Sequence, residues 1–243
     1  MKITYAMRTN QGERQYSEDS VRELNFGDEW FFALADGLGG MGHGEIASQT
    51  AVESAASRFN WDPERNRILE NCIETAQKAV LSRQIDNLEL RGMATTFVGL
   101  RLFENKAEWI HVGDSRLYCF QQGKIFSRTL DHSVPQMLVS AGTITSDEIR
   151  HHPDRSRLLK IIGNEWDEEN NYTVSPPVPI KEGDSFLICS DGLWEWVEDN
   201  EMEELLRGSE TTLQWLSGLE QLTVTRGKGN DLDNYSGICV FVR

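Results

Sequence analysis

The sequence has few cysteines and no long apolar run. Its four cysteines are widely spaced and include no Cys-x-x-Cys pair (Cys72, Cys119, Cys189 and Cys239). This spacing gives no indication of a zinc site or of a disulfide framework. No apolar stretch is long enough to cross a membrane, and the first residues do not resemble a signal peptide. We therefore expect a cytoplasmic protein that does not associate with membranes.

Basic residues are scarce as well. The chain has 24 Lys and Arg against 39 Asp and Glu, which gives a formal net charge of -15 at pH 7. Such a chain would repel the phosphates of a nucleic acid, so we do not expect nucleic-acid binding. The excess of acids suits a protein that holds cations, although a merely soluble surface explains it equally well.

The sequence also lacks Pro-rich or Gly/Ser-rich linkers, internal repeats and low-complexity tracts. Its 243 residues are 39% hydrophobic, which is enough for a sizeable core. We therefore expect one domain over residues 1–243, and a monomer.

Three apolar runs each end on an aspartate beside a glycine, at Asp36-Gly37, Gly113-Asp114 and Asp191-Gly192. Short runs rich in aromatic and branched residues predict buried strands. One Asp-Gly pair would be explained by a hairpin turn, but three favour a shared site. Carboxylates that meet at the rim of a sheet repel one another unless a cation lies between them. The pattern predicts an all-oxygen site for Mg²⁺ or Mn²⁺.

Strands and helices come in blocks along the chain. The patterning predicts strands at 3–7, 30–36, 94–103, 106–112, 116–121, 124–128, 172–174, 185–189 and 236–242, and helices at 45–59, 63–87, 133–140, 193–197, 200–207 and 211–223. A polar loop is expected between the first two strands, and a broken, polar excursion at about 143–169. Blocks of this kind, without strict βαβ alternation, indicate the α+β class, with two antiparallel sheets covered by helices.

Six short motifs carry a family resemblance. They are Gly12-x-Arg14-x-x-Ser17-Glu18-Asp19, Asp36-Gly37-Leu38-Gly39-Gly40, Gly113-Asp114-Ser115-Arg116, Asp131-His132-Ser133, Ser190-Asp191-Gly192-Leu193-Trp194 and Asp233-Asn234. Their order and spacing resemble the successive motifs of the bacterial branch of the PP2C (PPM) family, the metal-dependent protein Ser/Thr phosphatases. Each motif alone is weak, but six in order over nearly the whole chain are specific. The resemblance implies an α-β-β-α sandwich, with the excursion at about 143–169 as the family's flap.

The resemblance also implies the ligands of a two-metal site. Asp36 would bridge both ions, and the carbonyl of Gly37 would bind one of them. Asp191 and Asp233 would complete the site, and Asp19 would act mainly through metal-bound waters. Asp231 is a rival to Asp233 as a ligand, and we rank it lower because an asparagine follows Asp233.

Further roles follow for neighbouring residues. Arg14 would hold the substrate phosphate, since a guanidinium can bind two phosphate oxygens at once. With Asp36 and Asp191, it is the residue expected to carry catalysis. A third metal, as in bacterial members, would use Asp114, Asp191 and Glu195. Glu18 and Asn234 would support the metal ligands.

Three features depart from the family or lie outside its motifs. Ser17 stands where the family usually has Asn, and Leu38 where eukaryotic relatives have a histidine proposed as general acid. Basic residues gather within the excursion (Arg150, His151, His152, Arg155, Arg157 and Lys160). They form a solvated face by default, and the alternative is a docking surface for acidic phosphoproteins.

The function implied is hydrolysis of phosphoserine and phosphothreonine by a hydroxide that bridges two Mn²⁺ or Mg²⁺ ions. The substrates would be phosphoproteins made by a Ser/Thr kinase. Two alternatives belong to other classes: a catalytically silent PP2C-like binding module, and a calcium-stabilised structural β protein. The first would lack metal carboxylates, and the second would carry a repeated or EF-hand-like Asp-rich loop. The acids here are present and lie in distant segments, which favours the enzyme.

Overall fold

The computed structural model describes residues 2–167 and 171–243. Its strands are β1 (Ile3–Asn10), β2 (Asp19–Phe26), β3 (Glu29–Asp36), β4 (Phe97–Phe103), β5 (Lys106–Val112), β6 (Arg116–Gln121), β7 (Lys124–Arg128), β8 (Thr173–Val174), β9 (Val178–Pro179), β10 (Ser185–Cys189) and β11 (Tyr235–Val242). Its α-helices are α1 (Gly44–Trp61), α2 (Ile68–Asp86), α3 (Val134–Ser140), α4 (Asp191–Trp194), α5 (Asp199–Arg207) and α6 (Thr212–Gly227). No helix in these ranges has the length and apolarity needed to cross a membrane.

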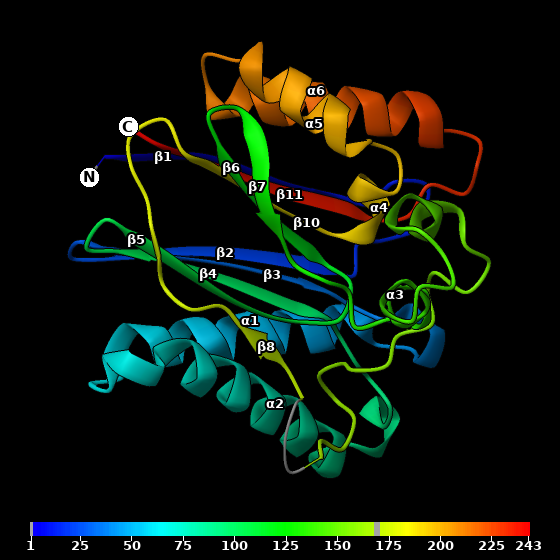
Figure 1. Cartoon of the computed structure of the whole chain (residues 1–243). Helices are drawn as coiled ribbons and strands as arrows, with labels where there is room; N and C mark the ends of the chain where they lie inside the picture. The colour runs from blue at the N-terminus through cyan, green and yellow to red at the C-terminus, as the bar shows by residue number, and fades with distance from the viewer. Residues whose placement is uncertain (1, 168–170) are drawn as a thin grey trace.

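Two antiparallel sheets lie face to face between two layers of helices (Figure 1). One sheet has the strand order β1-β11-β10-β6-β7, and α5 and α6 cover its outer face. The other has the order β2-β3-β4-β5-β8, with β9 also paired to β5, and α1 and α2 cover it. The α-β-β-α sandwich expected from the sequence is confirmed.

The apolar runs form strands that are buried on both faces. In β3, Phe31 and Ala33 point toward α1 and α2, whereas Phe32 and Leu34 point into the core between the sheets. Successive side chains of a strand face opposite ways, so a continuous apolar run fits a strand that lies between two apolar layers. The sandwich therefore has three apolar layers, one between the sheets and one beneath each helical layer.

The two hairpins predicted from the sequence are confirmed. Glu104 and Asn105, between β4 and β5, have φ values of 45° and 57°. Gln122 and Gly123, between β6 and β7, have φ values of 54° and 71°. Two consecutive left-handed residues are the signature of the tight turns that match the twist of a hairpin.

The main differences from the prediction are β2, the short strand β9 and the start of α2. The sequence predicts only a polar loop between the first strand and β3, whereas the structure has the strand β2 there. β2 lies at the edge of its sheet, and its polar outward residues obscure the alternation of apolar and polar residues that marks a strand. The helix predicted to start at Pro63 begins at Ile68, because Asp62 closes α1 and its Oδ1 accepts from the Glu64 N–H.

The excursion predicted at about 143–169 is described over residues 143–167. It contains one 3-10 segment, Ser146–His151, and no long helix or strand. Its last two residues, 168 and 169, lie outside the described part of the chain.

Candidate metal-binding active site

Four carboxylates from distant parts of the chain come to one end of the sandwich, where α3 and α4 lie (Figure 1). Asp19 opens β2 and pairs in register with Asp36, the last residue of β3. Asp114 lies in the turn between β5 and β6, and Asp191 is the first residue of α4, directly after β10. The strand ends named by the sequence pattern therefore do meet.

These carboxyl groups lie close enough to change one another's titration. Asp36 is within hydrogen-bonding range of both Asp19 and Asp191. Burial, together with the neighbouring negative charges, raises the pKa of Asp36 and of Asp191 well above the ordinary value. Burial raises the pKa of Asp19 to about 6 and that of Asp114 to about 7. Without a cation, the group compensates part of its charge by holding protons.

Short hydrogen bonds fix the positions of the two paired strand ends. Ser190 Oγ donates to Asp19 Oδ2 at 2.8 Å, and the Ser236 N–H donates to Ser190 Oγ at 2.9 Å. The Asp36 N–H donates to Thr96 Oγ1 at 3.0 Å. The sequence analysis does not assign these roles to Ser190 or Thr96. Ser190 could have been noticed, because it precedes an aspartate at a strand end, whereas Thr96 carries no such signal.

Arg14 binds Asp233 in this structure. Its Nε and Nη2 donate to the two carboxylate oxygens at 3.1 and 3.0 Å, and its Nη1 lies 3.3 Å from Asp231 Oδ1. Asp233 therefore faces the guanidinium group, while it lines the same cavity as Asp36 and Asp191. As arranged in this structure, residues 2–167 and 171–243 contain no group of three or more His, Cys, Asp or Glu side chains that could hold a metal ion.

Asn234, which follows Asp233, makes three hydrogen bonds to the loop over residues 11–18. Its Oδ1 accepts from the Glu18 N–H at 2.7 Å, and its Nδ2 donates to the carbonyls of Gln11 and Tyr16 at 2.9 and 3.0 Å. One side chain thus ties the loop over residues 11–18 to the start of β11.

Glu18 and Gly37 lie against the start of α1. The Glu18 carboxylate lies beside the backbone of Gly44, and burial, with nearby Glu45, raises its pKa. A Cβ on Gly37 would lie 2.2 Å from the carbonyl oxygen of Gly44 and 2.7 Å from that of Glu18. Only glycine fits where these backbone segments approach so closely.

The site opens into a cavity of about 570 Å³. Most of the predicted site residues line it, together with residues of the glycine-rich turn and of the excursion (Arg14, Glu18, Asp36, Gly37, Leu38, Gly39, Gly40, Asp114, Ser156, Leu158, Asp191 and Asp233). Asp19 is buried behind this lining. The sequence analysis does not single out Ser156 and Leu158, which form one wall.

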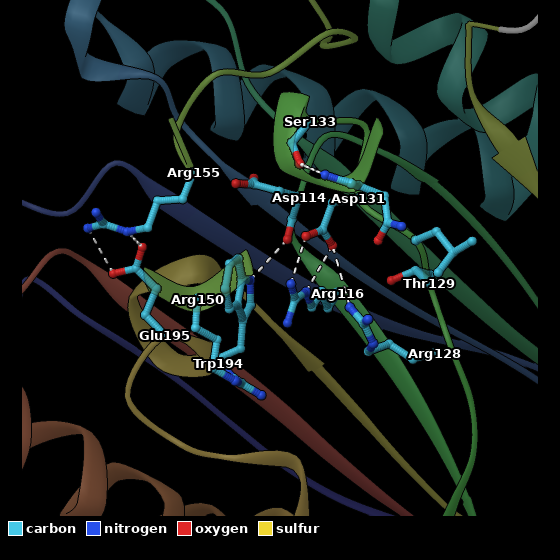
Figure 2. A network of polar contacts seen from close by, with 12 residues as sticks. Asp114, Arg116, Arg128, Thr129, Asp131, Ser133, Arg150, Arg155, Trp194 and Glu195 are labelled. Carbon is cyan, nitrogen blue, oxygen red and sulfur yellow. Dashed lines mark hydrogen bonds and ion pairs between the residues drawn. The ribbon is translucent and has the colours of Figure 1, made fainter. Parts of the chain in front are cut away.

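Glu195 does not line this cavity. Arg155 binds its carboxylate with two nitrogens, so the expected third-metal ligand is already paired (Figure 2). Arg150 is buried and pairs with Glu198 and Asp199. The basic residues of the excursion are therefore not a uniformly free cationic surface.

A buried ion pair lies directly behind Asp114 (Figure 2). Arg116 donates to both oxygens of Asp131 at 2.8 and 2.7 Å, and its guanidinium carbon lies 3.5 Å from the ring centroid of Trp194. Trp194 Nε1 donates to the Asp114 carbonyl at 3.0 Å. The tryptophan is buried and anchors the start of α4 to the turn that carries Asp114.

The donor set fits a hard divalent cation. The atoms that face the centre are carboxylate oxygens, which Mg²⁺ and Mn²⁺ prefer. Asp19 Oδ1 is buried and has no hydrogen-bond partner among the described residues. This oxygen lies beside acids whose pKa values are raised. A cation that binds here would take the place of the protons that these acids hold.

Comparisons with known proteins all indicate the same family. The model of the protein phosphatase 2C family matches residues 8–225. The serine/threonine protein phosphatase PstP of Mycobacterium tuberculosis is 31% identical over 211 residues, which cover 84% of this chain but only 39% of PstP. The serine/threonine phosphatase stp of Listeria monocytogenes is 32% identical over 212 residues, covering 84% of this chain and 83% of stp.

A solved structure gives the same result for the fold. The catalytic domain of PstP in complex with two manganese ions is similar with a TM-score of 0.81 and 27% identity, over 98% of this chain and 97% of that one. The match over residues 8–225, the relatives above 30% identity and the shared sandwich agree, and the chain belongs to the protein phosphatase 2C family.

Proposed function

We propose that this chain is a protein serine/threonine phosphatase that hydrolyses phosphoserine and phosphothreonine with two Mn²⁺ or Mg²⁺ ions. The observation that carries the proposal is the meeting of Asp36, Asp114 and Asp191 in the lining of one cavity, with Asp19 buried behind it and paired in register with Asp36. So many buried carboxylates are unfavourable without compensating charge. A site that stabilises a phosphoryl group needs that charge in the same place.

The proposed ligands follow from position. Asp36, the Gly37 carbonyl, Asp191 and Asp233 would hold the two ions, and Asp19 would support them through water. When bound, the ions lower the pKa of water toward neutrality and offset the charge of the phosphoryl oxygens. Glu195 serves as a third-metal ligand in this proposal only after it leaves Arg155.

Arg14 is proposed to exchange partners. Both of its bonds to Asp233 use the carboxylate oxygens that a metal would need. A cation that takes up Asp233 therefore frees the guanidinium group, which then presents the same two donors to a phosphate. Arg14 would thus change its partner from the Asp233 carboxylate to the substrate phosphate.

The proposed substrates are phosphoproteins made by a Ser/Thr kinase, and the proposed working unit is a monomer of one domain. The relatives named above carry the name of serine/threonine phosphatases, which supports the substrate class. The cytoplasmic location expected from the sequence stays a prediction.

The test is release of phosphate from a phosphothreonine peptide, with and without Mn²⁺. We expect Asp36→Asn and Asp191→Asn to lower kcat/KM by about 100-fold or more, because each removes a charge from the metal site. Asp28→Asn, on the exposed turn between β2 and β3, is the matched control and should behave as wild type. Calorimetry should show Mn²⁺ uptake by the control and weakened uptake by both site variants.

Two results would contradict the proposal. The absence of both Mn²⁺ uptake and hydrolysis in the wild type would favour a catalytically silent binding module. A thermal stability that responds to Ca²⁺ but not to Mn²⁺ would favour a calcium-stabilised structural protein.

A further inference from the structure

A second hollow, of about 580 Å³, lies on the other side of one wall of the catalytic cavity. Residues that the catalytic site does not use line it, among them Arg128, Leu130, Gln136, Met137, Leu159 and Val174. Its volume falls within the range of known ligand sites, about 300–1,000 Å³.

The wall between the two hollows is a short two-stranded ribbon. Ser133 forms a bridge with Leu158, and the Leu159 N–H donates to the His132 carbonyl at 2.7 Å. The side chains of consecutive residues alternate: Leu158 lines the catalytic cavity, and Leu159 lines the second hollow. A chain that crosses this ribbon would therefore contact both hollows.

Exposed apolar side chains gather around the second hollow. Leu130, Met137, Leu159 and Val174 are 58%, 52%, 53% and 41% exposed. Single exposed apolar residues are ordinary, whereas a group around one concavity marks a binding surface.

The hollow also contains polar atoms without partners. Gln136 is only 6% exposed, and its Oε1 has no hydrogen-bond partner among the described residues. Arg128 Nη1 is buried and likewise makes no hydrogen bond there, although it lies 3.8 Å from Asp131 Oδ1. Buried polar atoms are normally satisfied. Both atoms are covered in this structure, so they reach a ligand in the hollow only if their side chains turn toward it.

We propose that this hollow binds the peptide segment that flanks the phosphorylated residue of a substrate, and that it prefers an apolar side chain there. The inference rests on the proposed phosphatase function. An apolar side chain of the peptide covers Met137 and Leu159, and a peptide unit would pair with Gln136 and Arg128 once their side chains turn toward the hollow. Because one wall separates the two hollows, the second hollow lies next to the place where the phosphate would lie.

The wall also sets a spacing. A sheet with the side chains of both faces is about 10 Å thick, so passing from one face of the ribbon to the other takes about three to four extended residues at about 3.3 Å each. The apolar residue should thus stand three or four positions from the phosphothreonine.

The experiment compares phosphothreonine peptides that differ only at those positions, with Leu or Ser three and four residues to either side. Steady-state kinetics with Mn²⁺ should give the wild type a kcat/KM about five- to tenfold higher for the Leu peptide of one direction, mainly through KM. The ratio between the Leu and Ser peptides should fall to about one in the double variant Met137→Ser/Leu159→Ser. Because the ratio is taken within one variant, a general change in activity cancels.

The matched control is Ile85→Ser/Leu88→Ser, which removes two equally exposed apolar side chains (78% and 69% exposed) outside the hollow. It should keep the wild-type ratio. Equal hydrolysis of Leu and Ser peptides by the wild type, or an unchanged ratio in Met137→Ser/Leu159→Ser, would overturn the docking proposal and leave the phosphatase function standing. Failure to hydrolyse either peptide would instead overturn the phosphatase function, and the docking proposal with it.

Discussion

The buried pair between Arg116 and Asp131 should contribute strongly to the stability of the site end of the molecule. Both residues are almost fully buried, at 2% and 5% exposure, and they share two hydrogen bonds (Figure 2). Asp131→Asn would leave the guanidinium group without its counter-charge, held only against Tyr118 Oη and the Trp194 ring. Arg116→Met would leave Asp131 with Arg128, whose Nη1 is 3.8 Å away.

The two variants should therefore differ in how much free energy of unfolding they lose. Removing one partner of a buried ion pair costs about 3–5 kcal/mol. We expect Asp131→Asn near the upper end of this range and Arg116→Met near the lower end, because only the latter leaves a second cation nearby. For a chain of this length each kcal/mol lowers Tm by about 2–4 °C, so the expected decreases lie between about 6 and 20 °C.

Urea unfolding of both single variants and of Arg116→Met/Asp131→Asn measures the free energies. The double variant should lose less stability than the sum of the single variants, because it leaves no uncompensated buried charge. Arg157→Met breaks a solvent-exposed pair with Asp154 and should cost less than about 1 kcal/mol. If the free energy of unfolding of Asp131→Asn lies within about 1 kcal/mol of the wild-type value, the expected contribution of this pair is wrong.

Three further predictions concern the carboxylate site. The folded state raises the pKa of Asp19 to about 6 and of Asp114 to about 7, so the metal-free protein should lose stability as pH rises from about 4 to 7, because the unfolded chain releases these protons earlier. Thermal melts in EDTA across this range should show the decrease, and Mn²⁺ should reduce it. Arg14→Met should raise Mn²⁺ affinity in calorimetry while lowering kcat/KM, because Asp233 loses its competitor and the phosphate loses its donor; a parallel loss of both would contradict the exchange. Gly12→Ala should lower Tm and weaken Mn²⁺ binding, because Gly12 has a φ of 60° and an added Cβ would lie 2.2 Å from the Asp233 carbonyl oxygen; an unchanged melt would show that the loop can move freely.

The sequence was sufficient for the main layers and for the ends of the buried strands. Asp36, Asp114 and Asp191 end short apolar runs, and local composition alone marks such positions. It was insufficient for β2, because an edge strand with polar outward residues has no clear apolar period. Its first residue, Asp19, was nevertheless assigned to the site through the family motif.

Partners across long sequence separations could not be predicted in this way. Arg14 and Asp233 are 219 residues apart, and their pairing depends on how the loop over residues 11–18 docks onto the start of β11. Arg155 and Glu195 are likewise joined only by the folded arrangement of the excursion and α4. Charge patterns show that such residues exist, but which cation meets which acid is decided by tertiary packing.

The distribution of arginines explains why the centre of the site calls for an external cation. Three peripheral carboxylates each have a guanidinium partner from the chain itself (Arg14 with Asp233, Arg116 with Asp131, and Arg155 with Glu195). Asp19, Asp36 and Asp191 form no ion pair with an arginine among the described residues, and burial with neighbouring negative charges raises their pKa values. The charge that compensates these three carboxylates must therefore come from outside the chain. A small divalent ion would supply it at the centre, where the phosphoryl group would lie.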